Sequence, residues 1–162
     1  MKTLKIIILS SLLLTLISFR DSSKNKLRIT YEARGLITSI NLTIIGDLGH
    51  LTTTKFSYDS ITQQSRLYTY EVKSNIGAEK VELLVNLTNE LNLKEIQNYQ
   101  APTHRNGLDG DLATTLTIES KGQVFQTTHY DFGTPINEIA ALDNLLKTII
   151  DDLKRIPCTD NR

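Results

Sequence analysis

The sequence contains few of the residues that build covalent and metal sites. Its single cysteine, Cys158, can form neither an internal disulfide nor a zinc site made of cysteines. Tryptophan is absent, and the chain has only 3 prolines and 8 glycines. The 18 basic residues balance 18 acidic ones, so no excess of positive charge points to a nucleic-acid partner. These absences exclude a disulfide-rich scaffold, and 162 residues is the length of one domain.

The N-terminus has the pattern of a signal segment. Two lysines precede an apolar run over residues 6–19. A helix of this length would rise about 21 Å, which is less than the roughly 30 Å of a bilayer core. We therefore expect residues 1–20 to be a secretory signal segment and residues 21–26 to be a polar linker. The expected location is outside the cytoplasm, either periplasmic or secreted.

Two alternatives remain open for the signal segment. No pair of small residues is well placed for cleavage around residues 18–23, so the segment is either removed or stays as a membrane anchor. Membrane contact is predicted only through this segment. Without residues 1–20 the chain has 15 basic and 18 acidic residues, a net charge of −3. A mildly acidic domain again argues against nucleic acid as a partner.

Alternation of apolar and polar residues predicts four strands in the first half of the chain. The last of them is rich in Tyr, Thr and Val, which favour strands. The predicted strands cover residues 27–33, 36–44, 52–58 and 67–72. Gly35 marks the first break, and Gly46 and Gly49 are predicted to mark the turn after the second strand.

The apolar spacing then changes to three and four residues. It predicts an amphipathic helix over residues 78–91, followed by a short turn that carries Leu93 and Ile96. Residues 100–111 show no periodicity and are predicted to form a loop.

A hairpin and a second helix are predicted to complete the chain. The segments 112–120 and 124–131 read as the two strands of the hairpin. Thr134 is expected to cap the last helix and Pro135 to lie in its first turn. The apolar stripe of this helix should be buried, and its predicted core residues are Leu142, Leu146 and Ile149.

Together these elements predict an α+β fold. The expected architecture is an antiparallel sheet of four to six strands with two amphipathic helices packed on one face, in the order ββββ-α-ββ-α. The predicted domain covers residues 27–157 and leaves a tail, residues 158–162. The other face of the sheet, rich in Thr, Ser, Lys and Asn, is expected to face water.

The predicted loop over residues 100–111 is the candidate binding segment, because loops on a rigid scaffold often carry function. Its candidate binding residues are Pro102, His104, Arg105, Asp109 and Asp111. The two aspartates resemble part of a calcium loop, but a third oxygen ligand and the terminal glutamate are missing, so no metal is predicted. Aspartates that only stabilise the turn explain the pattern equally well.

No catalytic set is complete in the sequence. The G-x-S-x-G motif and a glycine-rich phosphate loop are absent, and the three histidines are not at metal-ligand spacing. His129 and Asp131 are two residues apart, so on a strand their side chains would point the same way. A hydrolytic site made of these two residues and the loop is the one enzyme hypothesis. We expect a protein that is not an enzyme and has no cofactor.

The layout of residues 27–156 resembles a known family. A strand, a glycine-containing break at Arg34-Gly35 and a second strand open the domain. A helix, the loop with Asp109, a hairpin, the Thr134-Pro135 turn and a terminal helix complete it. This layout is similar to that of the emfourin-type small proteins, which include inhibitors of thermolysin-like metalloproteases. It is also similar to that of exported bacterial proteins of unknown function.

The resemblance implies an exported binding domain with a protein partner, and it names a thermolysin-like metalloprotease as the partner class. The chain departs from the family pattern in having one glycine at the break where the family often has two. Its second to fourth strands are also longer, and it adds a signal segment. The alternative is an envelope interaction module that inhibits nothing.

Overall fold

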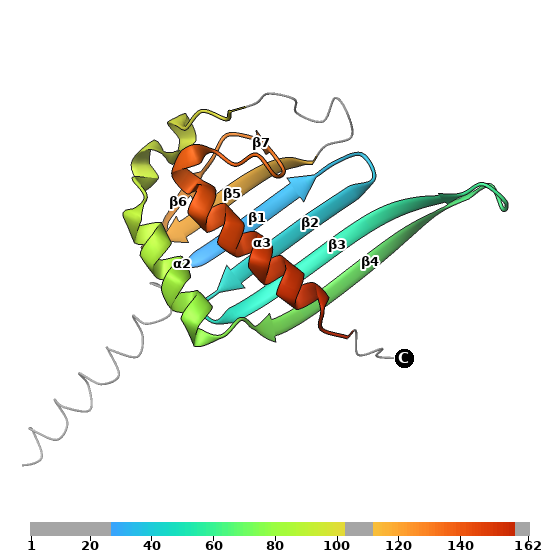
Figure 1. The fold of residues 1–162 in the computed structure, drawn as a ribbon, viewed down its shortest axis with the longest axis horizontal. Coiled ribbons are helices and arrows are strands. Elements are labelled where there is room, and N and C mark those ends of the chain that lie inside the picture. Colours follow the sequence, from blue (N-terminus) through green and yellow to red (C-terminus); the bar gives the residue numbers. More distant parts are fainter. Residues whose placement is uncertain (1–26, 103–111, 158–162) are drawn as a thin grey trace, which may run out of the picture.

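The computed structural model describes residues 27–102 and 112–157. The expected signal segment, linker and C-terminal tail lie outside the described residues, as does most of the predicted loop. The fold is α+β, as predicted, with an antiparallel sheet and helices packed against it (Figure 1). The sheet has seven strands where four to six were predicted, because the last predicted strand is divided into β6 and β7. Within the described ranges, no helix has both the length and the apolar character needed to cross a bilayer.

The sheet has the order β4-β3-β2-β1-β5-β6, and β7 pairs with β5 next to β6. Its first four strands are β1 (Arg28–Arg34), β2 (Thr38–Ile45), β3 (Leu48–Asp59) and β4 (Gln64–Asn75). They form a meander, in which each strand pairs antiparallel with the next. The remaining strands are β5 (Ala113–Ser120), β6 (Gln123–Gln126) and β7 (Tyr130–Asp131). Strand β5 pairs with the free side of β1, so the last strands extend the sheet opposite β4.

The two helices cover the sheet unequally, so the expectation of two amphipathic helices packed on one face is met only in part. The helical elements are α2 (Ala78–Glu90), the 3-10 helix η1 (Leu93–Asn98), the 3-10 helix η2 (Asn137–Ile139) and α3 (Ala140–Lys154). Helix α3 runs across the sheet, whereas α2 lies at one end of the strands (Figure 1). Six residues of α3 are buried, but only Leu84 and Thr88 of α2.

The last helix begins later than predicted. Thr134 does not cap it; its N–H donates to the Asp131 carbonyl in a turn, with an N–O distance of 3.0 Å. Ile136 is extended (ψ 134°) and completely buried. Helix α3 starts only at Ala140, after the single turn η2. Burial of Ile136 therefore holds the chain in an extended form that a helix starting at Pro135 would not allow.

The second strand of the last hairpin is broken by a β-bulge. In β6 the pairing joins Thr117 to Gln126, but in β7 it joins Thr114 to Tyr130. Between these two pairs, β5 has two residues, whereas the segment between β6 and β7 has three, residues 127–129. One extra residue on one strand of a pair defines a β-bulge. The Thr127 hydroxyl accepts from the Leu116 N–H at 3.1 Å and takes the place of a backbone carbonyl. The extra residue shifts the alternation, so that Tyr130 points into the core.

Gly49 lies inside β3 and not in a turn, which corrects the sequence-based expectation. A Cβ atom at this position would lie 2.7 Å from Ile76 Cγ2 and 3.3 Å from Leu153 Cδ1. The glycine therefore allows α3 and the end of β4 to pack closely on the strand. The turn itself contains only Gly46, which has a positive φ of 62°, and Asp47.

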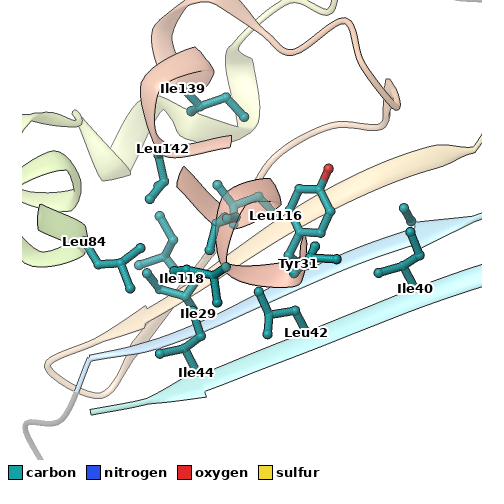
Figure 2. Close-up of a cluster of buried hydrophobic side chains, with 14 of the residues drawn as sticks. Ile29, Tyr31, Ile40, Leu42, Ile44, Leu84, Leu116, Ile118, Ile139 and Leu142 are labelled. Atoms are coloured by element: carbon teal, nitrogen blue, oxygen red, sulfur yellow. The ribbon is translucent and has the colours of Figure 1, made fainter. Parts of the chain in front are cut away.

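The core lies between the sheet and the helices. Side chains of β1, β2 and β5 point from one face of the sheet toward α2 and α3 (Figure 2). The predicted core residues Leu142, Leu146 and Ile149 are all buried. Lys80 of α2 joins Asp152 of α3 in an ion pair of 2.8 Å, which also holds the pKa of Asp152 below its usual value. The burial of Leu142, Leu146 and Ile149 confirms that periodicity predicted which side of the last helix is covered.

Candidate functional site

The far end of the β3–β4 hairpin extends beyond the rest of the sheet (Figure 1). Strand β2 pairs with β3 only as far as Lys55, although β3 continues to Asp59. Five large apolar side chains gather here, on the hairpin end and on the β1–β2 turn, and we name them the tip cluster. Its members and their exposed fractions are Leu36 (84%), Ile37 (60%), Phe56 (50%), Tyr58 (64%) and Leu67 (56%).

The tip cluster surrounds a shallow groove. Leu36, Ile37, Phe56 and Tyr58 line it, together with two serines of the hairpin. The Phe56 N–H donates to the Ile37 carbonyl at 2.7 Å, so the β1–β2 turn is attached to the hairpin. Phe56 also pairs across the strands with Leu67. Exposed apolar patches of this kind are typical of interaction sites.

The turn that ends the hairpin is held by Asp59. Its carboxylate accepts hydrogen bonds from the Ile61 N–H at 2.9 Å and from the Thr62 hydroxyl at 2.8 Å. These hydrogen bonds, with that of the Thr62 hydroxyl first, lower the pKa of Asp59 below its usual value. Ile61, within this turn, is 92% exposed. The apolar tip is therefore fixed in shape before any partner arrives.

The binding segment predicted from the sequence is described only at its start. Pro102 is exposed. The other candidate residues, His104, Arg105, Asp109 and Asp111, lie outside the described residues. Their part in binding stays a prediction.

The histidine of the enzyme hypothesis lies in the bulge. His129 Nδ1 is 2.8 Å from the hydroxyl oxygen of Thr115, so its ring orientation is set by β5. Asp131 lies in β7 and is buried. The loop that would complete a hydrolytic site lies outside the described residues, so the hypothesis stays untested. Among the described residues, no three His, Cys, Asp or Glu side chains are grouped as metal ligands would be.

The water-facing side of the sheet carries one charged group at its β4 edge. His50 Nε2 lies 2.8 Å from Glu71 Oε1, and Lys73 Nζ lies 3.4 Å from the same oxygen. The hydrogen bonds from His50 and Lys73 lower the pKa of Glu71. Beside this group, β2 and the first part of β3 present Ser39, Asn41, Thr43, Thr52 and Thr54 on the same side, as their alternation predicts.

A buried polar cluster lies under α3. The Tyr130 hydroxyl donates to Asp143 Oδ1 at 2.8 Å, and Asp143 is completely buried. Lys147, one helical turn further on, forms an ion pair with the same carboxylate. Burial first, and the nearby Asp143 carboxylate second, raise the pKa values of Tyr31 and Tyr130 far above their usual range. Both hydroxyls therefore stay protonated, and the cluster links α3 to the sheet, with only Lys147 partly exposed to solvent.

Comparison with known proteins identified no relative of this chain. No protein-family model, no curated protein and no solved structure matches the chain. The likeness to the emfourin-type proteins therefore stays a resemblance of layout.

Proposed function

We propose that the chain is an exported protein-binding domain that binds its partner through the tip cluster. The main support is the set of five exposed apolar side chains on the projecting hairpin end and on the β1–β2 turn beside it. A partner that covers them would remove a large apolar area from water, and binding is driven mainly by such burial. Because Asp59 already fixes the turn, little conformational entropy would be lost on binding.

The partner class we propose is a thermolysin-like metalloprotease, which the protein would inhibit. The support is the resemblance in layout, including the break at Arg34-Gly35. Leu36 and Ile37 follow this break directly and are the tip residues of the β1–β2 turn. Protease–inhibitor complexes form with little backbone movement, which suits a turn that is already attached to the hairpin.

We expect stoichiometric loss of protease activity when the chain is titrated against a thermolysin-like protease. The Leu36→Ser, Ile37→Ser double variant should weaken this inhibition by at least about tenfold, the effect of removing an interface anchor. Val124→Ser is the matched control, because Val124 is 66% exposed but lies on β6 at the other edge of the sheet. A His104→Ala, Arg105→Ala variant measures the contribution of the predicted loop.

Three outcomes distinguish binding through the tip cluster, binding through the predicted loop and the absence of inhibition. Inhibition lost only in the tip variant supports the tip cluster, and inhibition lost only in the loop variant assigns binding to the loop. If the protease stays active in an excess of the chain, the proposed inhibition is wrong. The alternative is then a non-inhibitory envelope module, and its partner should copurify with the native chain but not with the tip variant.

Export is part of the proposal and has its own test. Mass spectrometry of the protein recovered outside the cytoplasm should give an N-terminus between about residues 18 and 27, after the apolar run. A chain that starts at Met1 in the membrane fraction would identify the segment as an uncleaved anchor. A chain that starts at Met1 in the cytoplasm would refute export.

A further inference from the structure

We infer that two copies of this chain pair through their β4 edges to form one continuous sheet. This inference concerns the part of β4 next to α2, residues 69–75, which is separate from the tip cluster. It goes beyond the proposed function and does not depend on it. The occupant of the edge is a second copy of the chain. Both the geometry of the strand and its charges favour this occupant.

The outer edge of β4 has unpaired backbone groups. The Phe56 N–H donates to the carbonyl of Ile37, just before β2, and the Ile76 N–H donates to the carbonyl of Asp47 at 2.9 Å. In an antiparallel sheet, hydrogen-bonded and non-hydrogen-bonded pairs alternate. The even-numbered residues of β4 therefore bond to β3, and the odd-numbered residues 65–75 present N–H and C=O groups at the outer edge. No described strand pairs with that side of β4.

The edge also lacks most of the features that usually prevent strand pairing. It is 12 residues long, contains no proline and pairs with β3 from Asp59↔Gln64 to Leu48↔Asn75 without a bulge. Natural proteins protect such an edge with prolines, bulges, a covering segment or charged side chains, and of these β4 has only the charges of Arg66, Glu71 and Lys73. A long, regular edge that no described strand covers is a ready template for another strand (Figure 1).

The charges on the edge are self-complementary. Glu71 and Lys73 are two residues apart and point to the same, water-facing side of the sheet. When two β4 strands pair antiparallel about Val72, Glu71 faces the partner's Lys73, and Lys73 faces the partner's Glu71. Opposite charges directly across a strand pair stabilise it. The neighbouring registers set Glu71 against Glu71 or Lys73 against Lys73 and are repulsive, so the charges select this register.

The test uses charge reversal in the full exported chain, with sedimentation equilibrium as the readout. The unchanged chain should dimerise. Glu71→Lys alone sets lysines against lysines, and Lys73→Glu alone sets glutamates against glutamates. Each single variant should therefore raise the dimer dissociation constant about tenfold or more. Because each variant carries the charge that the other needs, an equal mixture of the two should form a heterodimer.

Two controls make the result specific to the edge. Lys94→Glu changes the net charge as Lys73→Glu does, but on the exposed side of η1, and should leave dimerisation unchanged. Thermal melting of each variant verifies that the fold is retained. A chain that stays monomeric at concentrations on the order of 100 μM would overturn the inference. So would single variants that dimerise as the unchanged chain does, or a mixture that does not associate.

Discussion

Leu146→Ala is expected to lower the free energy of unfolding by about 2–5 kcal/mol, the range measured for buried leucines. Leu146 is completely buried on the side of α3 that faces the sheet. The loss has two parts, the transfer free energy of the removed methyl groups and the cavity that they leave. Because the strands below are fixed by hydrogen bonds to both neighbours, they cannot close that cavity fully. Urea unfolding of the variant and of the unchanged chain measures the difference.

An exposed leucine provides the control for this experiment. Leu83 lies on α2 and is 45% exposed, so Leu83→Ala should change stability by only about 0.5 kcal/mol. If Leu146→Ala costs no more than Leu83→Ala, the stripe on α3 is not the face that holds the helix to the sheet. The same comparison tests the unequal roles of the two helices, because α2 contributes far fewer buried residues than α3.

Periodicity is sufficient to predict the α+β class and most of the strands and helices of this fold. Alternation located β1 to β4, and spacing of three and four residues located α2 and the buried stripe of α3. These patterns can be read because the core lies on one side of the sheet. Every strand and helix then has one apolar and one polar side.

Two local departures from periodicity, at Gly49 and at residues 127–129, could not be predicted from the sequence. Gly49 reads as a turn residue, but its role depends on Ile76 and Leu153, which reach it from distant parts of the chain. The bulge at residues 127–129 depends on a hydrogen bond that the Thr127 hydroxyl accepts from the Leu116 N–H, and no pattern along one strand indicates it. Both features are set by tertiary contacts.

The tip cluster was missed for a different reason. Phe56 and Tyr58 continue the alternation of β3, so their side chains are predicted to share a face, as they do. Alternation does not show where the neighbouring strand ends. The signal that was available is the length of the hairpin, which exceeds what β2 can cover. A strand longer than its neighbour must project, and apolar residues on the projection must be exposed.

For the buried carboxylate of Asp143, the sequence does contain a signal. It is four residues after Ile139 and three before Leu146, which places a carboxylate on the apolar side of α3. A charge at such a position is retained only when it has partners. Its partner Tyr130 lies beyond the bulge, so the pair could not be predicted from spacing.

Asp143→Ala is expected to destabilise the protein by about 3–5 kcal/mol, the usual cost of breaking a buried pair by removing one member. The substitution leaves the Tyr130 hydroxyl without its acceptor in the core, and a buried donor without an acceptor is itself costly. It also leaves the Lys147 ammonium without its carboxylate; Phe132 remains, with its ring centroid 5.1 Å from that ammonium nitrogen. Urea unfolding again gives the free energy.

Asp151→Ala is the matched control, because it removes a carboxylate from the same helix at a position that is 66% exposed. Its ion pair with Lys154 lies in water, so the expected change is at most about 1 kcal/mol. Tyr130→Phe then separates the two contacts of Asp143, since it removes the hydroxyl and keeps the ion pair. A smaller loss for Tyr130→Phe than for Asp143→Ala would show that Lys147 contributes. If Asp143→Ala costs no more than Asp151→Ala, the buried cluster does not hold α3 on the sheet, and its attachment depends on the apolar stripe alone.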